Sequence, residues 1–340
     1  MVMFQSFNTT GIGSLPHTDP AEACRIILDS VDIPFWPQLP HRSFLELMVP
    51  QYSEGFPFVR IEDETIHVQH QPDEQALTVF YEAVAGNSGF PVSREYAAGL
   101  HAFIDILAGR DRRLETVKGH ITGPLTFTLS LTDDQKRPIY FDDELRELSL
   151  ELLKGKAAWQ IEALRPYAEN VLIFIDEPIL SALGTSAYIG VSHEEASRML
   201  REIVGHVKAC GAIAGIHCCG KADWPLVLGS GIDVFNYDSY FFWDTLGIYP
   251  DEMKAFIENG GYIAWGVVPT TEAIREVNLR GLQEQLERGL SSLEEAGIPR
   301  DRLRRQALIT PSCGAGSLNT EDTIKVFSLL KELRNRYAGG

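Results

Sequence analysis

The feature that most constrains this chain is a repeated alternation between short Val- and Ile-rich segments and longer segments of helical periodicity. Short apolar runs are typical of strands buried on both faces of a parallel sheet. Strand then helix, eight times over, is the pattern of a (β/α)8 barrel. We therefore predict an α/β fold, a (β/α)8 TIM barrel, with a doubly wound sheet as the alternative. The predicted strands cover residues 9–14, 33–38, 118–122, 171–176, 212–217, 233–238, 262–267 and 306–310.

Helix signals lie between most of these strands. Residues 142–165, 193–210 and 320–336 carry apolar side chains at helical spacing. Asp19 and Asp223, each followed closely by a proline, have the residue order of a helix start.

One domain accounts for the whole chain. The 340 residues, 44% of them hydrophobic, suit a single barrel spanning residues 1–340. The interval 41–117, between the second and third predicted strands, is too long for one helix and two loops. We predict that it is an insertion that holds extra helices and a loop over the barrel mouth.

The overall charge narrows the classes of partner. A formal net charge of −17 argues against nucleic acid and anionic membrane surfaces. Residues 1–10 lack the basic and apolar regions of a signal peptide. No apolar run approaches the roughly 20 residues needed to cross a bilayer. We expect a cytoplasmic protein that acts on a small molecule.

The strongest local signal is a group of metal-type ligands. Side chains alternate along a strand, so His217 and Cys219 point the same way and Cys218 points opposite. Cys313 follows the last predicted strand, and the C-terminal strand ends of a barrel converge on one face. An imidazole and two thiolates form a zinc set that leaves one position open. The alternative is a core histidine with buried thiols.

Asp238 is a candidate fourth metal ligand, and a capping role is the alternative. Asp238 closes the sixth predicted strand, where its carboxylate could bind the metal or cap the following segment. The five cysteines, odd in number and sparse, argue against a disulfide framework and leave metal or thiol chemistry for the clustered ones.

Two carboxylates end the fourth predicted strand. Asp176 and Glu177 follow five apolar residues and point to opposite sides. Charges at this end of a barrel strand indicate catalysis or substrate binding. One could hold a substrate ammonium and the other could pair with an Arg or Lys of the barrel. A purely structural ion pair is the alternative.

Glycines mark the end of the first predicted strand. Gly11 and Gly13 allow the backbone to approach a ligand closely, although a tight turn would need them too. A third glycine at dinucleotide-binding spacing is missing. For His120, on the third predicted strand, we favour a core or supporting position over a catalytic one.

In this order, the motifs resemble the C-terminal catalytic barrel of cobalamin-independent methionine synthase. They also resemble the wider superfamily, with its corrinoid-dependent thiol methyltransferases and uroporphyrinogen decarboxylase. The resemblance covers nearly the whole chain. It rests on residues 9–16, 120–125, 175–178, 217–219 and 311–314.

The resemblance implies roles for particular residues. His217, Cys219 and Cys313 would be zinc ligands and the catalytic centre, and Asp238 stands where the family has a ligand glutamate. Asp176 and the loop around Ser14 would hold the amino-acid part of homocysteine. The predicted substrate-binding residues are Ile12, Gly13, Ser14 and Asp176.

Three features depart from the family: Asp238 is shorter than the family's glutamate, residues 265–269 contain no counterpart of its catalytic histidine, and the chain has room for one barrel only. The family's folate-binding carboxylate segment is also not found, which argues against methyltetrahydrofolate as the methyl donor. We therefore expect zinc-dependent methyl transfer to homocysteine, giving methionine, from a methylcorrinoid that is free or carried by a partner protein. The alternatives are a uroporphyrinogen decarboxylase-like enzyme and a non-catalytic barrel that binds a thiol or a corrinoid protein.

Overall fold

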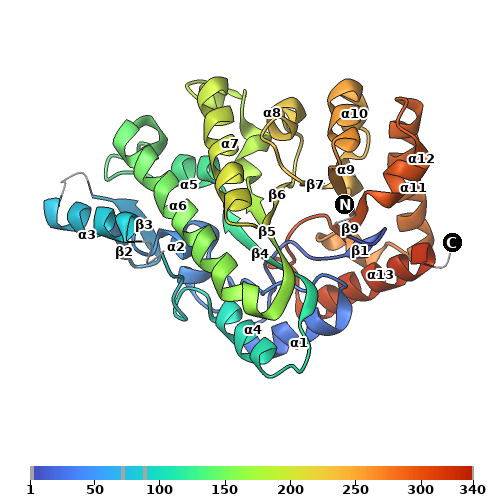
Figure 1. Ribbon diagram of the computed structural model, residues 1–340, viewed down its shortest axis with the longest axis horizontal. Coiled ribbons are helices and arrows are strands. Elements are labelled where there is room, and N and C mark those ends of the chain that lie inside the picture. The colour runs from blue at the N-terminus through green and yellow to red at the C-terminus, as the bar shows by residue number, and fades with distance from the viewer. Residues whose placement is uncertain (1–3, 70–72, 87–89, 339–340) are drawn as a thin grey trace.

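Seven parallel strands form one curled sheet surrounded by helices (Figure 1). The computed structural model describes residues 4–69, 73–86 and 90–338. The strand order is β1-β9-β8-β7-β6-β5-β4, and every pairing is parallel. The α/β class and the parallel sheet are as predicted. The strands are β1 (Asn8–Thr9), β4 (Leu114–Thr122), β5 (Ala168–Asp176), β6 (Ile213–Cys218), β7 (Val234–Tyr237), β8 (Tyr262–Val268) and β9 (Ala307–Pro311).

Alternate residues of the strands belong to two separate cores, as the period of two requires. On β5, Leu172 and Phe174 pack into a small cluster within the curl of the sheet, here called the inner face. Ile173 and Ile175 pack into the larger cluster between the sheet and the helices. The small cluster comprises Phe4, Ile12, Ile33, Leu172, Phe174, Val234, Tyr262, Ala264 and Leu308.

The strand predicted at 33–38 is corrected by the structure. This segment runs between β1 and β4, but it makes only isolated parallel bridges, Ser14 with Gln38 and Phe35 with Lys118. Pro34 and Pro37 have no N–H to donate, so a continuous ladder cannot form. The prediction placed the segment correctly and was wrong about its regularity.

Side chains fill the place of the missing ladder. Gln160 reaches the seam between β4 and segment 33–38, where its Oε1 accepts the His120 N–H at 3.0 Å and the Trp36 indole N–H at 2.9 Å. Its Nε2 donates to the His120 carbonyl at 3.0 Å, to which the Tyr52 hydroxyl also donates. The N–H and carbonyl of His120, which face the side of β4 that has no neighbouring strand, are therefore hydrogen-bonded by side chains.

The helices begin where the sequence indicates. Asp19 accepts hydrogen bonds from the N–H groups of Ala21 and Glu22, and Asp223 accepts one from Leu226, which confirms both as caps. The three predicted helices correspond to α6 (Asp143–Leu164), α7 (His193–Ala209) and α13 (Thr320–Ala338). Within the described residues, no helix is both long and apolar enough to cross a membrane. Outside the 41–117 interval the helices are α1 (Pro20–Ser30), α5 (Pro124–Ser130), α6 (Asp143–Leu164), α7 (His193–Ala209), α8 (Trp224–Leu228), α9 (Ser239–Phe242), α10 (Pro250–Glu258), α11 (Leu279–Glu295), α12 (Arg300–Arg305) and α13 (Thr320–Ala338).

The interval 41–117 contains the predicted extra helices and also an antiparallel hairpin that was not predicted. Near its beginning, the Met48 carbonyl accepts a hydrogen bond from Thr122, so α2 lies at the C-terminal end of β4. In contrast, α3 packs at the side of the molecule beside α6 (Figure 1). The elements are α2 (Met48–Ser53), β2 (Val59–Glu62), β3 (Thr65–Val68), α3 (Glu74–Ala85) and α4 (Ala98–Ala108).

Candidate metal centre

Three ligand-type side chains meet at the C-terminal ends of the strands. His217 lies on β6, Cys219 follows it, and Cys313 follows β9. One potential ligand atom from each lies within 4.8 Å of the other two. His217 is 3% exposed and the two cysteines are partly buried. The structure thus brings together the three residues that the sequence placed on one face of the fold.

The His217 ring is oriented by Asn236, its register partner on β7. Asn236 donates through Nδ2 to the Ala264 carbonyl at 2.7 Å and to the Thr310 hydroxyl at 2.8 Å. Its Oδ1 must therefore be the acceptor in the hydrogen bond with His217 Nδ1, so Nδ1 carries the proton. The lone pair is then on Nε2, a buried nitrogen for which the described residues supply no partner other than the neighbouring Cys219 thiol. A nitrogen placed in this way fits a metal bond.

The two sulfurs differ in their affinity for a proton. The neighbouring Cys313 and His217 side chains lower the pKa of Cys219 to about 4. Proximity to Cys219, together with burial, raises the pKa of Cys313. Burial opposes protonation of His217, but Cys219 and Asp176 raise its pKa. Without a metal the cluster thus carries a thiolate, which is the form of cysteine that binds metal ions.

Asp238 follows β7 and caps the next helix. Its Oδ1 accepts the Phe241 N–H at 3.0 Å at the start of α9. Burial raises its pKa to about 6. Its oxygens are not among the ligand atoms that converge in the described structure. The capping alternative is therefore present, and a role as fourth ligand stays a prediction.

Asp176 lies beside His217 in the register of β5 and β6. It is 5% exposed, and its Oδ1 has no hydrogen-bond partner among the described residues. Burial raises its pKa to about 6, against the opposing effects of His217 and Lys118. The predicted substrate-binding carboxylate is thus buried next to the ligand cluster and has an oxygen available.

Lys118 is buried on the inner face of β4. Its ammonium donates to the Ile12 carbonyl and lies 4.4 Å from the centre of the Phe174 ring. Burial lowers its pKa to about 7, although the carboxylate of Asp176 raises it. No feature of the sequence marks Lys118 as functional, because one lysine within a strand pattern gives no signal of its own.

Glu177 has a structural role. It accepts hydrogen bonds from the Leu125 N–H at 2.9 Å and from the Thr126 N–H and hydroxyl at 2.7 and 2.6 Å. The pairing with an Arg or Lys that was considered for one of the two carboxylates is not found for Glu177 within the described chain. It instead holds the first turn of α5, and burial raises its pKa to about 7.

The loop after β1 packs directly against the residues that follow Cys313. The Ser14 carbonyl accepts the Ala315 N–H at 2.8 Å. A Cβ on Gly314 would lie 2.1 Å from the Ser14 hydroxyl, so any larger residue there would have to displace that hydroxyl. The predicted substrate loop, Ile12 to Ser14, is therefore adjacent to the third metal-type ligand.

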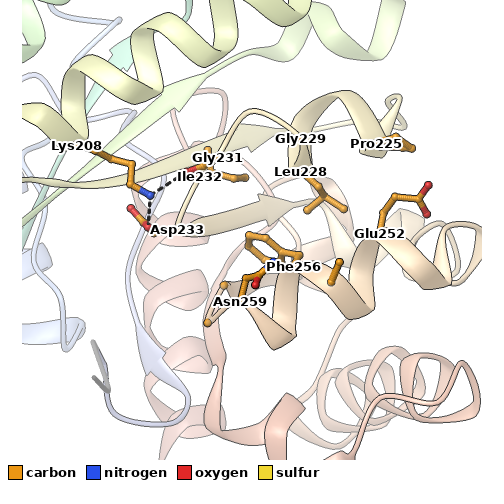
Figure 2. Close-up of a pocket in the computed structure, with 13 residues that line it drawn as sticks. Lys208, Pro225, Leu228, Gly229, Gly231, Ile232, Asp233, Glu252, Phe256 and Asn259 are labelled. Carbon is orange, nitrogen blue, oxygen red and sulfur yellow. Dashed lines mark hydrogen bonds and ion pairs between the residues drawn. The ribbon is translucent and has the colours of Figure 1, made fainter.

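A groove at the other end of the strands is separate from this centre (Figure 2). It has a volume of about 410 Å³ and lies between α8 and α10, next to Asp233, which precedes β7. Lys208 donates to Asp233 at 2.7 Å and to the Gly231 carbonyl at 2.9 Å, so these two charged side chains pair with each other. We assign it no part in the metal centre.

Comparison with known proteins gives structural relatives only. No protein-family model and no curated protein sequence matches this chain. A B12-independent methionine synthase from Shewanella sp., solved in complex with selenomethionine, superimposes with a TM-score of 0.61 at 14% identity, covering 98% of both chains. A methyltransferase from Methanosarcina mazei gives 0.58 at 12% identity, covering 98% of this chain and 94% of that one. The chain has the fold of these two proteins.

Proposed function

We propose that this chain is a zinc-dependent methyltransferase that moves a methyl group to a thiol, with homocysteine as acceptor and methionine as product. The observation that carries the proposal is the convergence of His217, Cys219 and Cys313 with the unprotonated Nε2 of His217. The methyl-transferring enzymes among the structural relatives support the reaction class. The resemblance in sequence motifs supports it independently.

The donor set fits zinc. His217, Cys219 and Cys313 would hold the ion, with Asn236 orienting the imidazole. When bound, zinc converts a substrate thiol, whose pKa is ordinarily about 8.5, into a thiolate that is nucleophilic at neutral pH. Three protein ligands leave one coordination position for that thiol, and the chain's remaining task is to align it with the methyl group.

Groups for the rest of an amino-acid thiol surround the cluster. The buried carboxylate of Asp176 has a free oxygen that could accept hydrogen bonds from an ammonium group. The loop Ile12 to Ser14 lies beside Cys313 and offers backbone N–H groups to a carboxylate. An anionic site for the amine and a donor site for the acid favour homocysteine over a thiol without these groups.

The methyl donor that we propose is a methylcorrinoid, free or on a partner protein. A donor of that size needs an open and partly apolar surface near the metal. Exposed apolar side chains occur in segments that follow the C-terminal ends of strands, at Phe141, Ile189, Phe241 and Ile248. These positions are suited to contact with a large carrier.

Metal analysis of the purified protein and three variants tests the proposal. We expect about one zinc per chain in the wild type, lost in Cys219→Ser and Cys313→Ser. Cys210→Ser is the matched control, because Cys210 lies on the far end of α7, beside His206. Zinc-loaded protein should transfer methyl from methylcobalamin to homocysteine. Zinc retained in both ligand variants, or no methyl transfer by the loaded wild type, would contradict the proposal.

A further inference from the structure

A groove at the N-terminal ends of the strands is lined by two arginines. It has a volume of about 560 Å³, which is in the range of sites for small organic molecules. It lies between residues 4–6 before β1, Tyr262 at the start of β8, and the end of α12, just before β9. These strands run parallel, so the groove is at the opposite end of the sheet from the metal centre. It is distinct from the groove between α8 and α10, although Gly260 lines both.

The two arginines are on one side of α12. Arg302 and Arg305 are three residues apart in the helix, so their side chains are neighbours on its surface. Neither side chain makes an ion pair or a hydrogen bond with any residue that the structure describes. In contrast, Arg300 and Arg304 of the same helix both pair with Glu287 of α11. The groove side of α12 therefore presents two guanidinium groups whose donors are available to a ligand.

The charge of the groove favours an anion. Glu258, at the exposed end of α10, is the one carboxylate among the described lining residues, and it pairs with neither arginine. The groove thus has an excess of positive charge in a chain whose net charge is −17. A phosphate monoester carries about two negative charges at neutral pH and accepts hydrogen bonds from guanidinium groups in a matching planar geometry. Two neighbouring arginines suit it better than a carboxylate, which carries one charge.

The buried part of the lining is apolar. Phe4 and Tyr262 pack edge to face with ring centroids 5.1 Å apart, and each is 3% exposed. Both belong to the small cluster on the inner face of the sheet, and the buried Ile257 lies beside them in the lining. This side of the groove is therefore formed before any ligand binds. The volume is greater than a phosphate group needs, and the space next to these side chains suits an organic group.

We propose that this groove is a second binding site, which takes a phosphate monoester of an organic group such as a nucleoside or a sugar. Arg302 and Arg305 bind the phosphate, and the organic group lies against Ile257 and the edges of the Phe4 and Tyr262 rings. The site is separate from the zinc and thiol chemistry, because the two sites are at opposite ends of the strands. Binding therefore requires neither zinc nor homocysteine.

Isothermal titration calorimetry with the purified protein tests the site. The probes are adenosine 5′-monophosphate and ribose 5-phosphate, each compared with its counterpart without phosphate, adenosine or ribose. We expect at least one ester to bind with a dissociation constant below about 1 mM, and about tenfold or more tightly than its counterpart. The ester that binds more tightly shows whether the organic group is a nucleoside or a sugar. Saturating homocysteine should leave this affinity unchanged.

Three variants test the role of the arginines. Arg302→Gln and Arg305→Gln should each weaken binding of the ester about ten- to hundredfold, because each removes hydrogen bonds to a charged group. Arg302→Lys keeps the charge but not the planar guanidinium, so it should recover part of the affinity. The matched control is Arg280→Gln, which removes the same charge at the start of α11, at the end of the sheet where β8 finishes. It should leave the affinity unchanged.

The proposal is overturned if neither ester binds, if an ester binds no better than its counterpart, or if homocysteine competes with it. It is also overturned by an affinity that is unchanged in both glutamine variants or is equally reduced in Arg280→Gln. Arg302 and Arg305 have no partners among the described residues, so their variants should keep the zinc content and circular dichroism of the wild type. A loss of binding then reports on the groove, and none of these results bears on methyl transfer.

Discussion

Replacing Asn236 with leucine tests whether the hydrogen bond to His217 supports metal binding. Leucine is close to asparagine in volume but removes the acceptor for the Nδ1–H and the donor to Ala264 and Thr310. In the metal-free variant the imidazole can shift its proton and turn an N–H toward Cys219. With metal on Nε2 it cannot, so the buried Nδ1–H is left without an acceptor only in the bound state.

The size of the effect follows from that difference. An unsatisfied buried N–H costs about 1–3 kcal/mol. Removing a residue that supports a metal-binding histidine typically weakens the metal site by about 10- to 100-fold. The two ranges overlap at about 1.4–2.7 kcal/mol, since each tenfold change in affinity is about 1.4 kcal/mol. We expect the zinc dissociation constant of Asn236→Leu to rise about 10- to 100-fold.

Competition for zinc against a chromophoric chelator measures this constant. Asn236→Asp retains the acceptor and should bind zinc at least as tightly as the wild type, although it faces the Ala264 carbonyl without a donor. Asn278→Leu, which removes the cap of α11, controls for a general loss of stability. A dissociation constant of Asn236→Leu within about threefold of the wild type, in a folded protein, would refute the assignment of Nε2 as the ligand atom.

Three further results are expected. Gln160→Met should lower the free energy of unfolding by about 2–5 kcal/mol, measured by denaturant titration, because it leaves the His120 N–H and the Trp36 indole N–H unpaired. The control Gln75→Met, on the exposed face of α3, should change the free energy of unfolding little. Glu177 has a pKa of about 7 when folded, above its ordinary 4.5, so its contribution to stability is complete below pH about 4.5 and is lost as the pH rises through about 7. Glu177→Gln should therefore flatten the stability profile in that window, and an unchanged slope would count against the shift. Gly13→Ala places a methyl group 2.9 Å from the His120 ring and should weaken homocysteine binding, whereas Gly205→Ala, with nothing within 4 Å, should stabilise α7 by about 0.5–1 kcal/mol.

The strands that carry the ligands were readable from the sequence because their signal is local. Val171 to Ile175 form an apolar run that ends in two carboxylates, and the structure has β5 there. The alternation of His217 and Cys219 needs only the period of a strand. The convergence with Cys313 follows from the topology of parallel strands, which an α/β alternation already specifies.

The parts that the sequence did not reveal depend on contacts between distant residues. Asn236 supports His217 because β6 and β7 are in register, and nothing in the sequence around either residue indicates that the two are in contact. The irregular segment 33–38 could have been recognised from its two prolines, which remove ladder donors. Its replacement partner, Gln160, is 124 residues away from Trp36 in the chain, on a helix whose pattern shows nothing unusual at that position.

The seam between β4 and segment 33–38 also affects how this chain tolerates mutation. Elsewhere the sheet is joined by main-chain groups, which no single amino-acid replacement except proline can delete. At the seam there is one such main-chain hydrogen bond, from the Lys118 N–H to the Pro34 carbonyl, and the rest of the work is done by the amide of Gln160 and the hydroxyl of Tyr52. One codon change abolishes either of these side-chain contacts. Substitutions at these two positions should therefore be selected against more strongly than substitutions at ordinary core positions. A deep mutational scan would show both as positions that tolerate few amino acids, unlike their neighbours in the sequence.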